Sequence, residues 1–306
     1  MSKCNGPILR DIKKQMIKVI DTFINNSYGN LKRDYITTTL NKFFIFNKCK
    51  EFNRSYVYDN SFSMFSEDDI KIFNNIQHLI NIIKFTDGLS ILKEMGWLDK
   101  YNTLNKSNIK EYECLLDGSQ ISNTYKNLIN VGVYYLNRNN SFLPLHDHPG
   151  MLVISKCIYG ELRATSMSPI KNDSEIDIDS FSYKNYDYQD KKEQDKSMLK
   201  FSKSSSNSIY LSNNKGIEYA KLEKKSVLKY NNIDVVYPLS CNLHEISLNS
   251  INKKHTDKNI DEAVLFDVFI PHYIPDKEEY SINYYTAIDN FKNFNSKTNL
   301  KLMKFV

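Results

Sequence analysis

The sequence predicts a mainly β protein, built as a sandwich or barrel of short strands, with helices in its N-terminal third. Two observations support this fold class. From about residue 124 onward, short segments rich in β-branched and aromatic residues are separated by turn-forming pairs such as Pro149-Gly150 and Tyr159-Gly160. Before that point, apolar residues recur at helical spacing. Strands that follow one another without intervening helices favour a sandwich or barrel over a parallel α/β sheet.

Three helices are expected near the N-terminus. Residues 7–24 start with Pro7, which suits the first turn of a helix, and carry a stripe of apolar residues. A second helix is expected after Ser66, which can form a capping box with Asp69. A short third helix is expected over Leu89–Met95. We interpret the apolar stripes as packing surfaces rather than as cofactor contacts.

Residues 101–306 are expected to form the β domain, on which the helical region of residues 1–100 packs. The expected strands are Val131–Leu136, Leu152–Ile158, Leu162–Thr165, Val235–Tyr237, Val264–Phe269 and Ile282–Thr286. A polar tract over about residues 169–215 lacks an apolar period, and we expect a disordered surface insertion there. A shorter polar insertion spans residues 249–262. A partner-binding arm is the functional alternative to a solvated loop in both tracts.

The composition narrows the functional classes. The 306 residues are 41% hydrophobic, which is enough for a sizeable core, and the net charge of +5 comes without a dense basic stripe. Nucleic acid is therefore not an expected partner. The five cysteines are scattered without a CxxC pair, which argues against a disulfide framework or zinc cluster and fits a reducing compartment. We find no secretory signal and no stretch of ~20 apolar residues, so we expect no membrane association and a cytoplasmic protein, with the nucleus as the alternative.

The most informative segment is Leu143–Gly160, which reads LPLHDHPGMLVISKCIYG. Residues two apart on a strand point to the same face, so His146 and His148 could hold one metal ion while Asp147 points the other way. This spacing alone is weak support for a metal site, because a His-x-His pair is often an accidental surface pair.

The segment LPLHDHPGM, followed by a Tyr-Gly turn, resembles the first metal motif of a cupin. More narrowly, it resembles the thiol dioxygenases that act on cysteamine or on the N-terminal cysteine of proteins, 2-aminoethanethiol dioxygenase and the plant cysteine oxidases. The resemblance implies a cupin double-stranded β-helix, which is a jelly-roll barrel. Ordinary cupins place a glutamate ligand where this sequence has Val153. Its absence agrees with the thiol dioxygenases, which hold iron with three histidines.

Three later histidines are candidates for the third ligand: His244, His255 and His272. The segment VVYPLSCNLHEIS resembles the second family motif, and this resemblance implies His244. The segment departs from the family by placing Cys241 where glycine is expected and by a loop that looks one residue shorter. His255 lies in a polar insertion and reads as exposed. His272 stands where the family usually has proline, and we interpret it as a loop residue near the site.

The segment AVLFDVFIPHYIPDKEEYSINYYTA resembles the last strands of the family. The pattern alone leaves inward and outward orientations of Asp267 equally open, and the resemblance implies an inward aspartate near the metal. Tyr273 matches a family tyrosine at the mouth of the active site. Tyr284 and Tyr285 match a Tyr-Tyr pair. Some family members crosslink this pair to a cysteine two residues earlier, where this chain has Ile282, so we expect no crosslink.

The resemblance covers about residues 66–167 and 217–289 and implies a non-haem Fe(II) dioxygenase that converts a thiol and O2 to a sulfinic acid. The thiol would be cysteamine or a Cys-initiated protein N-terminus. No arginine is obviously placed to bind a substrate carboxylate, and the nearest, Arg163, reads as outward-facing. The resemblance implies that iron is held by His146, His148 and His244. It also implies that three further residues shape the pocket or handle protons: Asp267, Tyr273 and Tyr284.

Three alternatives remain open. The first is a metal cupin of another class, such as an isomerase or a carbon–carbon dioxygenase. The second is a non-catalytic sensor or binding module on the same barrel. The third is a scaffold whose function lies in the helical region and the polar insertions. We expect a monomer whose partners are the thiol substrate and O2.

Overall fold

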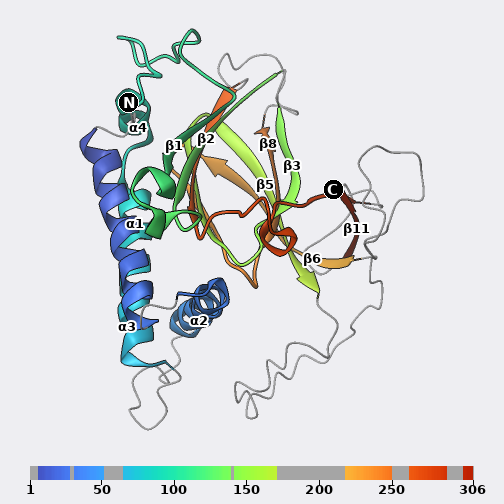
Figure 1. Ribbon diagram of the computed structural model, residues 1–306. Coiled ribbons are helices and arrows are strands. Elements are labelled where there is room, and N and C mark those ends of the chain that lie inside the picture. The colour runs from blue at the N-terminus through green and yellow to red at the C-terminus, as the bar shows by residue number, and fades with distance from the viewer. Residues whose placement is uncertain are drawn as a thin grey trace.

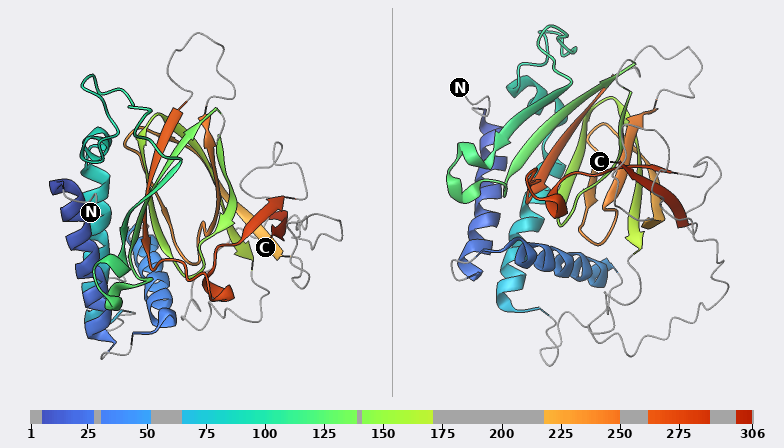
Figure 2. Two further views of the ribbon diagram at one scale, coloured as in Figure 1. Left: turned by 45° about the horizontal axis from the view of Figure 1, so that its top comes forward. Right: turned by 45° about the vertical axis from the view of Figure 1, so that its right-hand side comes forward.

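The computed structural model describes residues 6–27, 31–51, 65–138, 141–170, 218–249, 262–287 and 299–305. Within these ranges, two antiparallel sheets face each other, and helices cover the outer surface of one sheet (Figure 1, Figure 2). The mainly β fold with N-terminal helices is therefore confirmed.

The two sheets join strands that are far apart in the sequence. The first sheet has the order β1 (Tyr112–Asp117), β2 (Asn130–Asn137), β9 (Glu262–Ile270), β4 (Leu152–Tyr159) and β7 (Ile233–Val236). The second has the order β10 (Tyr284–Ala287), β11 (Asn299–Phe305), β6 (Glu218–Lys229), β5 (Glu161–Ile170), β8 (Leu243–Leu248) and β3 (Phe142–Asp147). Strand β10 also pairs with β3, which closes the second sheet on itself. Two facing sheets with this connectivity form the double-stranded β-helix of the cupin fold.

The helices are α1 (Pro7–Asn26), α2 (Arg33–Glu51), α3 (Glu67–Phe85) and α4 (Gly88–Glu94). Helices α1 and α3 lie side by side against the first sheet, and α2 lies near one end of the strands (Figure 1, Figure 2). Helix α3 begins with the expected capping box: the hydroxyl oxygen of Ser66 accepts the Asp69 N–H at 3.0 Å, and the Asp69 carboxylate accepts the Ser66 N–H at 3.0 Å. Helix α2 was not among the elements predicted from the sequence.

Strand β9 shows how the first sheet divides the core. Phe266 and Val268 face the helices and belong to the large cluster that fills the space beneath them. Leu265 and Phe269 alternate with these residues and face the second sheet, where they join two smaller clusters inside the barrel. Asp267 lies between Leu265 and Phe269 and shares their orientation.

The limits of the two polar insertions differ from the expected ones. Strand β5 continues through Pro169 to Ile170, so it includes the start of the tract that we expected to be an insertion. Strand β9 begins at Glu262, the last residue of the shorter expected insertion. The remainder of the two tracts, about residues 171–215 and 250–261, lies outside the described residues.

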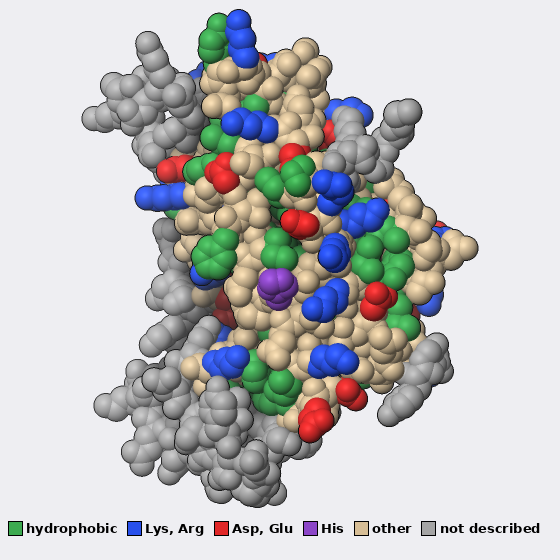
Figure 3. All heavy atoms as spheres, turned by 90° about the vertical axis from the view of Figure 1, so that its left-hand side faces the viewer, with side chains coloured by type: hydrophobic (Ala, Val, Ile, Leu, Met, Phe, Trp, Pro, Cys, Tyr) green, Lys and Arg blue, Asp and Glu red, His purple; other side chains and the backbone are tan. Residues whose placement is uncertain are grey.

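The face of the molecule that carries the helices shows Lys and Arg side chains interspersed with Asp and Glu, without a continuous basic stripe on that face (Figure 3). Separate hydrophobic side chains lie among them (Figure 3). Among the described residues, no helix has both the length and the apolar character needed to cross a membrane.

Candidate metal centre

Three buried histidines converge inside the barrel. His146 and His244 are direct partners across the β3–β8 pair, and His148 follows the end of β3. The Nε2 atoms of His148 and His244 are 2.9 Å apart, and those of His244 and His146 are 3.1 Å apart. The structure therefore brings together the three residues that the sequence and the resemblance singled out, and the group could hold a metal ion.

The two separations test whether a metal ion fits the cluster. Imidazole nitrogens lie about 2.0–2.1 Å from a bound metal, so two nitrogens at a right angle are about 3.0 Å apart and two at a tetrahedral angle about 3.4 Å apart. The distances of 2.9 and 3.1 Å match the right angle. This spacing fits neighbouring ligands of an octahedral ion, which leaves further positions open for other molecules.

Second hydrogen bonds set the orientation of two of the rings. The carbonyl oxygen of Pro144 lies 2.7 Å from Nδ1 of His146, so Nδ1 carries the proton and Nε2 keeps a free lone pair. The hydroxyl of Tyr273 donates to the carbonyl of Asp147 at 2.8 Å and lies 2.6 Å from Nδ1 of His148. Because its one proton goes to the carbonyl, the Tyr273 oxygen accepts from Nδ1–H of His148, whose Nε2 is then also free.

Burial keeps the three imidazoles neutral. It lowers the pKa of His146 to about 4, because a charged ring loses its hydration inside the barrel. The pKa values of His148 and His244 fall well below the usual value, first through burial and then through the proximity of the other rings. Neutral imidazole is the form that binds a metal ion, so the cluster is in its ligating state near pH 7.

Side chains around the motif hold the backbone of the site. Asn242, in the loop before β8, accepts the His148 N–H at 2.7 Å and donates to the carbonyl of Pro238 at 2.8 Å. Asp147 points away from the cluster, as expected, and its carboxylate accepts the Asn283 N–H at 2.8 Å and the Tyr285 hydroxyl at 2.9 Å. Asp147 therefore fixes the chain that leads into β10. The sequence analysis assigned no such role to these residues.

Helix α2 supports the same turn from outside the barrel. Arg33 donates to the carbonyl oxygen of Pro149 at 3.0 Å and to that of His272, and its guanidinium lies 4.4 Å above the Tyr280 ring. Burial lowers the pKa of Arg33 to about 10, which leaves it charged near pH 7. This role of Arg33 could not be predicted, because nothing in the sequence connects residue 33 to the motif more than 100 residues away.

The turn after His148 requires a glycine. Gly150 has φ +68°, and a Cβ atom there would lie 2.5 Å from Oγ1 of Thr37 in α2. The left-handed backbone and the close approach of α2 both exclude a side chain at this position. The Pro-Gly pair therefore sets the end of β3 and the distance between the metal motif and the helix.

Asp267 faces the interior of the barrel and is 2% exposed. Burial raises its pKa to about 7; the neighbouring Asp234 also raises it, and the Ser155 hydroxyl opposes the rise. Its Oδ1 atom has no hydrogen-bond partner among the described residues. Asp267 is therefore an inward carboxyl group that is about half protonated near neutral pH, and its catalytic role remains a prediction.

The remaining candidate residues of the site differ in how deeply they are buried. Tyr284 is the direct β-sheet partner of His146, with the two ring centres 6.1 Å apart, and it is 41% exposed, so it lies at the rim. The hydroxyl of Tyr273 is directed at His148, and its place at the mouth of the site remains a prediction. His272 packs against Tyr273 with ring centres 5.5 Å apart, and burial lowers its pKa to about 4. His255 lies outside the described residues.

Comparisons with known proteins agree with this architecture. A sequence profile of the family described as PCO_ADO matches residues 119–303. None of the curated proteins compared with this chain matches it.

Similar solved structures include a protein with a double-stranded β-helix domain from Klebsiella pneumoniae (13% identity, 57% of this chain and 84% of that chain, TM-score 0.26). L-ribose isomerase from Cellulomonas parahominis is 12% identical over 54% of this chain and 60% of its own, with a TM-score of 0.27. Oxalate decarboxylase from Lactobacillus farciminis is 12% identical over 56% of this chain and 30% of its own, with a TM-score of 0.26. The matches thus span less than two thirds of the isomerase and decarboxylase chains, and at these TM-scores they carry no argument about function.

The profile match covers more than half of the chain and includes the three histidines, Asp267 and both tyrosines of the candidate site. The chain belongs to the plant cysteine oxidase and cysteamine dioxygenase family.

Proposed function

We propose that this chain is a non-haem Fe(II) thiol dioxygenase that adds both atoms of O2 to a thiol and forms a sulfinic acid. The substrate would be a Cys-initiated protein N-terminus or cysteamine. The proposal rests on one observation: three neutral imidazoles converge, with His244 at right-angle spacing from each of the other two, and no carboxylate accompanies them in the group that the described residues form. Family membership supports the same reaction class.

The absence of a carboxylate ligand from this group affects what the site can bind. Val153, which stands where ordinary cupins have a glutamate ligand, lies inside the barrel in an apolar cluster with Met151, Val236 and Phe269. Three neutral ligands leave the full charge of a divalent ion uncompensated, which favours an anionic ligand such as a thiolate. Bound Fe(II) would supply the activation of the thiol and the reaction with O2.

The residues of the chain would have distinct roles around this centre. His146, His148 and His244 would hold the iron through Nε2, and Tyr273 would keep the His148 ring in its ligating orientation. Asp267 would accept a proton inside the barrel, because its pKa of about 7 lets it exchange protons at neutral pH.

Other side chains would shape access to the site. Phe269 lies 6.0 Å from the His148 ring and, with its apolar neighbours, excludes water from that side. Tyr284 at the rim would contact the part of the substrate that extends outward.

The arginines near the site are engaged elsewhere, which favours substrates without a carboxylate. The Arg33 guanidinium is bound to carbonyl oxygens behind the turn, and Nε of Arg163 donates to Asn249 at 2.6 Å. Neither is placed to bind the carboxylate of free cysteine. This supports cysteamine or an N-terminal cysteine, whose carboxyl group is part of a peptide bond.

The reaction can be tested by mass spectrometry. Iron-loaded protein is incubated in air with cysteamine or with a Cys-initiated peptide, and we expect the thiol product to gain the mass of two oxygen atoms. A peptide that starts with Ser instead of Cys is the substrate control. His78→Ala, at an exposed position on α3, is the protein control for His244→Ala, which should abolish the gain. Iron-loaded protein that leaves both thiols unchanged would contradict the proposal and favour another class of metal cupin.

A further inference from the structure

A row of three polar residues crosses the inner face of the first sheet. Ser155 of β4 is the direct partner of Asp234 in β7 and of Asp267 in β9. Direct partners in antiparallel strands point to the same side of the sheet. That side is the barrel interior, because Val153 and Phe269, two residues along their strands, belong to the interior cluster. The three side chains therefore lie next to one another inside the barrel.

A second polar row crosses the facing sheet and contains two of the histidines. Ser166 of β5 is the direct partner of Lys224 in β6 and of His244 in β8, and His244 is the partner of His146. Leu228, four residues after Lys224, packs in the interior cluster, which places Lys224 on the inner face as well. This row thus connects the metal centre to Lys224.

The two rows meet at the edge of the first sheet. Strand β7 is the last strand of that sheet, and Lys224 of β6 bridges to it through an ion pair with Oδ1 of Asp234. The Asp234 side chain is 4% exposed, whereas that of Lys224 is 39% exposed. The ion pair therefore connects the barrel interior to the surface.

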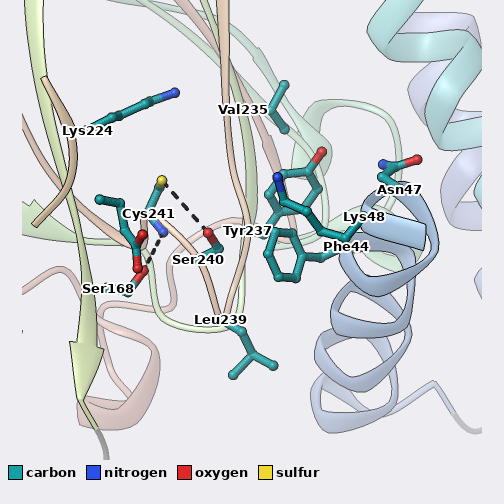
Figure 4. A pocket seen from close by; sticks show the side chains of 11 residues that line it. Phe44, Asn47, Lys48, Ser168, Lys224, Val235, Tyr237, Leu239, Ser240 and Cys241 are labelled. Carbon is teal, nitrogen blue, oxygen red and sulfur yellow. Dashed lines mark hydrogen bonds between the residues drawn. The ribbon is translucent and has the colours of Figure 1, made fainter. Parts of the chain in front are cut away.

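A surface pocket begins at this ion pair. It has a volume of about 460 Å³ and lies between α2 and the strands, where Lys224 and Cys241 form part of its wall (Figure 4). Phe44 and Lys48 of α2 form the opposite side, together with Tyr237, whose ring centre lies 5.1 Å from that of Phe44 (Figure 4). Lys224 thus has one side toward solvent and the other toward Asp234.

Four buried atoms of the two rows have no partner at full hydrogen-bond geometry among the described residues, although the Ser155 hydroxyl lies close enough to Asp267 to lower its pKa: Oγ of Ser155 and of Ser166, Oδ2 of Asp234 and Oδ1 of Asp267. Buried polar atoms are almost always hydrogen-bonded, either to protein or to ordered water. Because these atoms lie close together on the two inner faces of the barrel, they can supply the several polar partners that each ordered water needs. They therefore indicate a chain of ordered waters between the two sheets.

We propose that the polar side chains of the first row form a proton path inside the barrel. The path runs from Asp267 past Ser155 to Asp234 and reaches solvent at Lys224. This inference rests on the proposed function, because it assigns an exit to the proton that the thiol substrate loses. The residues beyond Asp267 act at a distance from the substrate, so they are positioning residues for proton transfer rather than catalytic residues.

The proposed path balances the chemistry of the reaction. Conversion of a thiol and O2 to a sulfinate releases one proton. The S–H bond breaks and an O–H bond forms on the Asp267 carboxylate, without a change of oxidation state in that step. The proton then passes through water to Asp234 and on to solvent at Lys224, and Asp267 is a carboxylate again for the next turnover.

The titratable groups that face Asp267 are compatible with this direction of transfer. They are Asp234 on one side and Tyr112, Tyr134 and Tyr273 on the others. Burial raises the pKa of all three tyrosines, so they stay protonated and do not accept the proton. Asp234 is then the neighbouring acceptor that connects to solvent.

The first test is a comparison of charge variants in the iron-loaded enzyme. Asp234→Asn and Lys224→Met keep side-chain size, and Lys225→Met removes an exposed lysine of the same strand as the matched control. For the first two variants we expect kcat to fall on the order of 10-fold, with iron content unchanged. The ratio of rates in H2O and D2O should rise, and small weak bases added to the buffer, which can accept the released proton, should restore part of the rate. Lys225→Met should change none of these quantities.

An ion pair with only a structural role would give a different result. Slower turnover without a change in the H2O/D2O ratio, and without rescue by weak bases, would overturn the proton path. So would unchanged turnover in Asp234→Asn. If the charge variants fail to fold, Ser155→Ala keeps both charges while interrupting the row and is judged by the same two readouts.

The second test needs no turnover and therefore separates this inference from the proposed function. A high-resolution crystal structure of the protein without iron should show ordered waters within hydrogen-bond distance of Asp267 Oδ1, Ser155 Oγ and Asp234 Oδ2. A dry interior would overturn the path even if the enzyme oxidises thiols. Ordered waters in a protein that does not oxidise thiols would support the path and reject the function.

Discussion

Replacement of Asp267 by Asn should stabilise the protein at high pH and impair the enzyme. Asp267 is buried, and its pKa rises from 3.8 to about 7 on folding. A carboxyl group with a raised pKa favours folding below its unfolded value, and this contribution is lost as the pH rises through the folded value. Above pH 7 the buried carboxylate opposes folding by about 4 kcal/mol at most, because a tenfold change in a protonation equilibrium corresponds to about 1.4 kcal/mol.

The stability effect can be measured by urea unfolding of the two proteins without iron. Asn has nearly the same shape as Asp but no charge, so at pH 4 the two proteins should differ little. As the pH increases from 4 to 8, the free energy of unfolding of Asp267→Asn should exceed that of the wild type by a growing margin, up to about 4 kcal/mol. A difference that stays constant over this pH range would mean that the carboxyl group is not buried as described.

The same variant tests the catalytic role. The rings of His146 and His148 are oriented by Pro144 and Tyr273 rather than by Asp267, so iron content should be retained. If Asp267 supports the metal centre as proposed, we expect thiol-dependent O2 consumption to fall by about 10–100-fold, the usual effect of losing an outer-shell group. Unchanged O2 consumption would refute the role of Asp267 in proton transfer. A parallel loss of iron would instead indicate that the carboxylate is a ligand.

Three further predictions concern the metal centre and the insertion. His146→Ala, His148→Ala and His244→Ala should each lose nearly all iron and turnover, whereas His255→Ala should retain both. Iron retention in His244→Ala together with iron loss in His255→Ala would instead identify His255 as the third ligand. Tyr273→Phe removes the acceptor for the His148 Nδ1–H, and its iron affinity, measured by competition with a chelator, should fall by about 10–100-fold. Removal of residues 172–210 with a short linker should give a folded, iron-binding protein by thermal unfolding and metal analysis, since surface loops close at low entropic cost. Loss of folding would show that this tract is structural.

Six of the strands and the histidine cluster could be predicted because their signals are local or carried by short motifs, whereas β1, β6 and β11 were not among the expected elements. The β2, β4, β5, β7, β9 and β10 segments all coincide with runs of β-branched and aromatic residues between turn formers. Helix α2 was missed for the opposite reason. Three consecutive threonines, Thr37, Thr38 and Thr39, and several aromatic residues give it a low intrinsic helix propensity. Only tertiary packing of its buried residues, such as Leu40 and Phe43, makes this segment helical.

The contacts that hold the site could not be predicted from the sequence. Asn242 and Tyr285 reach the metal motif through single hydrogen bonds that span many residues of sequence, and such pairings leave no periodic pattern. The pattern also left the orientation of Asp267 undecided. A strand buried on both faces, as β9 is, has no hydrophobic alternation from which the direction of one polar side chain can be read.

The contact between α2 and the histidine turn makes the N-terminal region part of the metal centre. Arg33 and Thr37 hold the carbonyl oxygens of Pro149 and Gly150, directly after His148. Any partner, modification or truncation that displaces this helix would therefore alter iron retention without touching a ligand. The segment that precedes the family match thus supports the turn that carries His148 and would influence how tightly the barrel holds a metal ion.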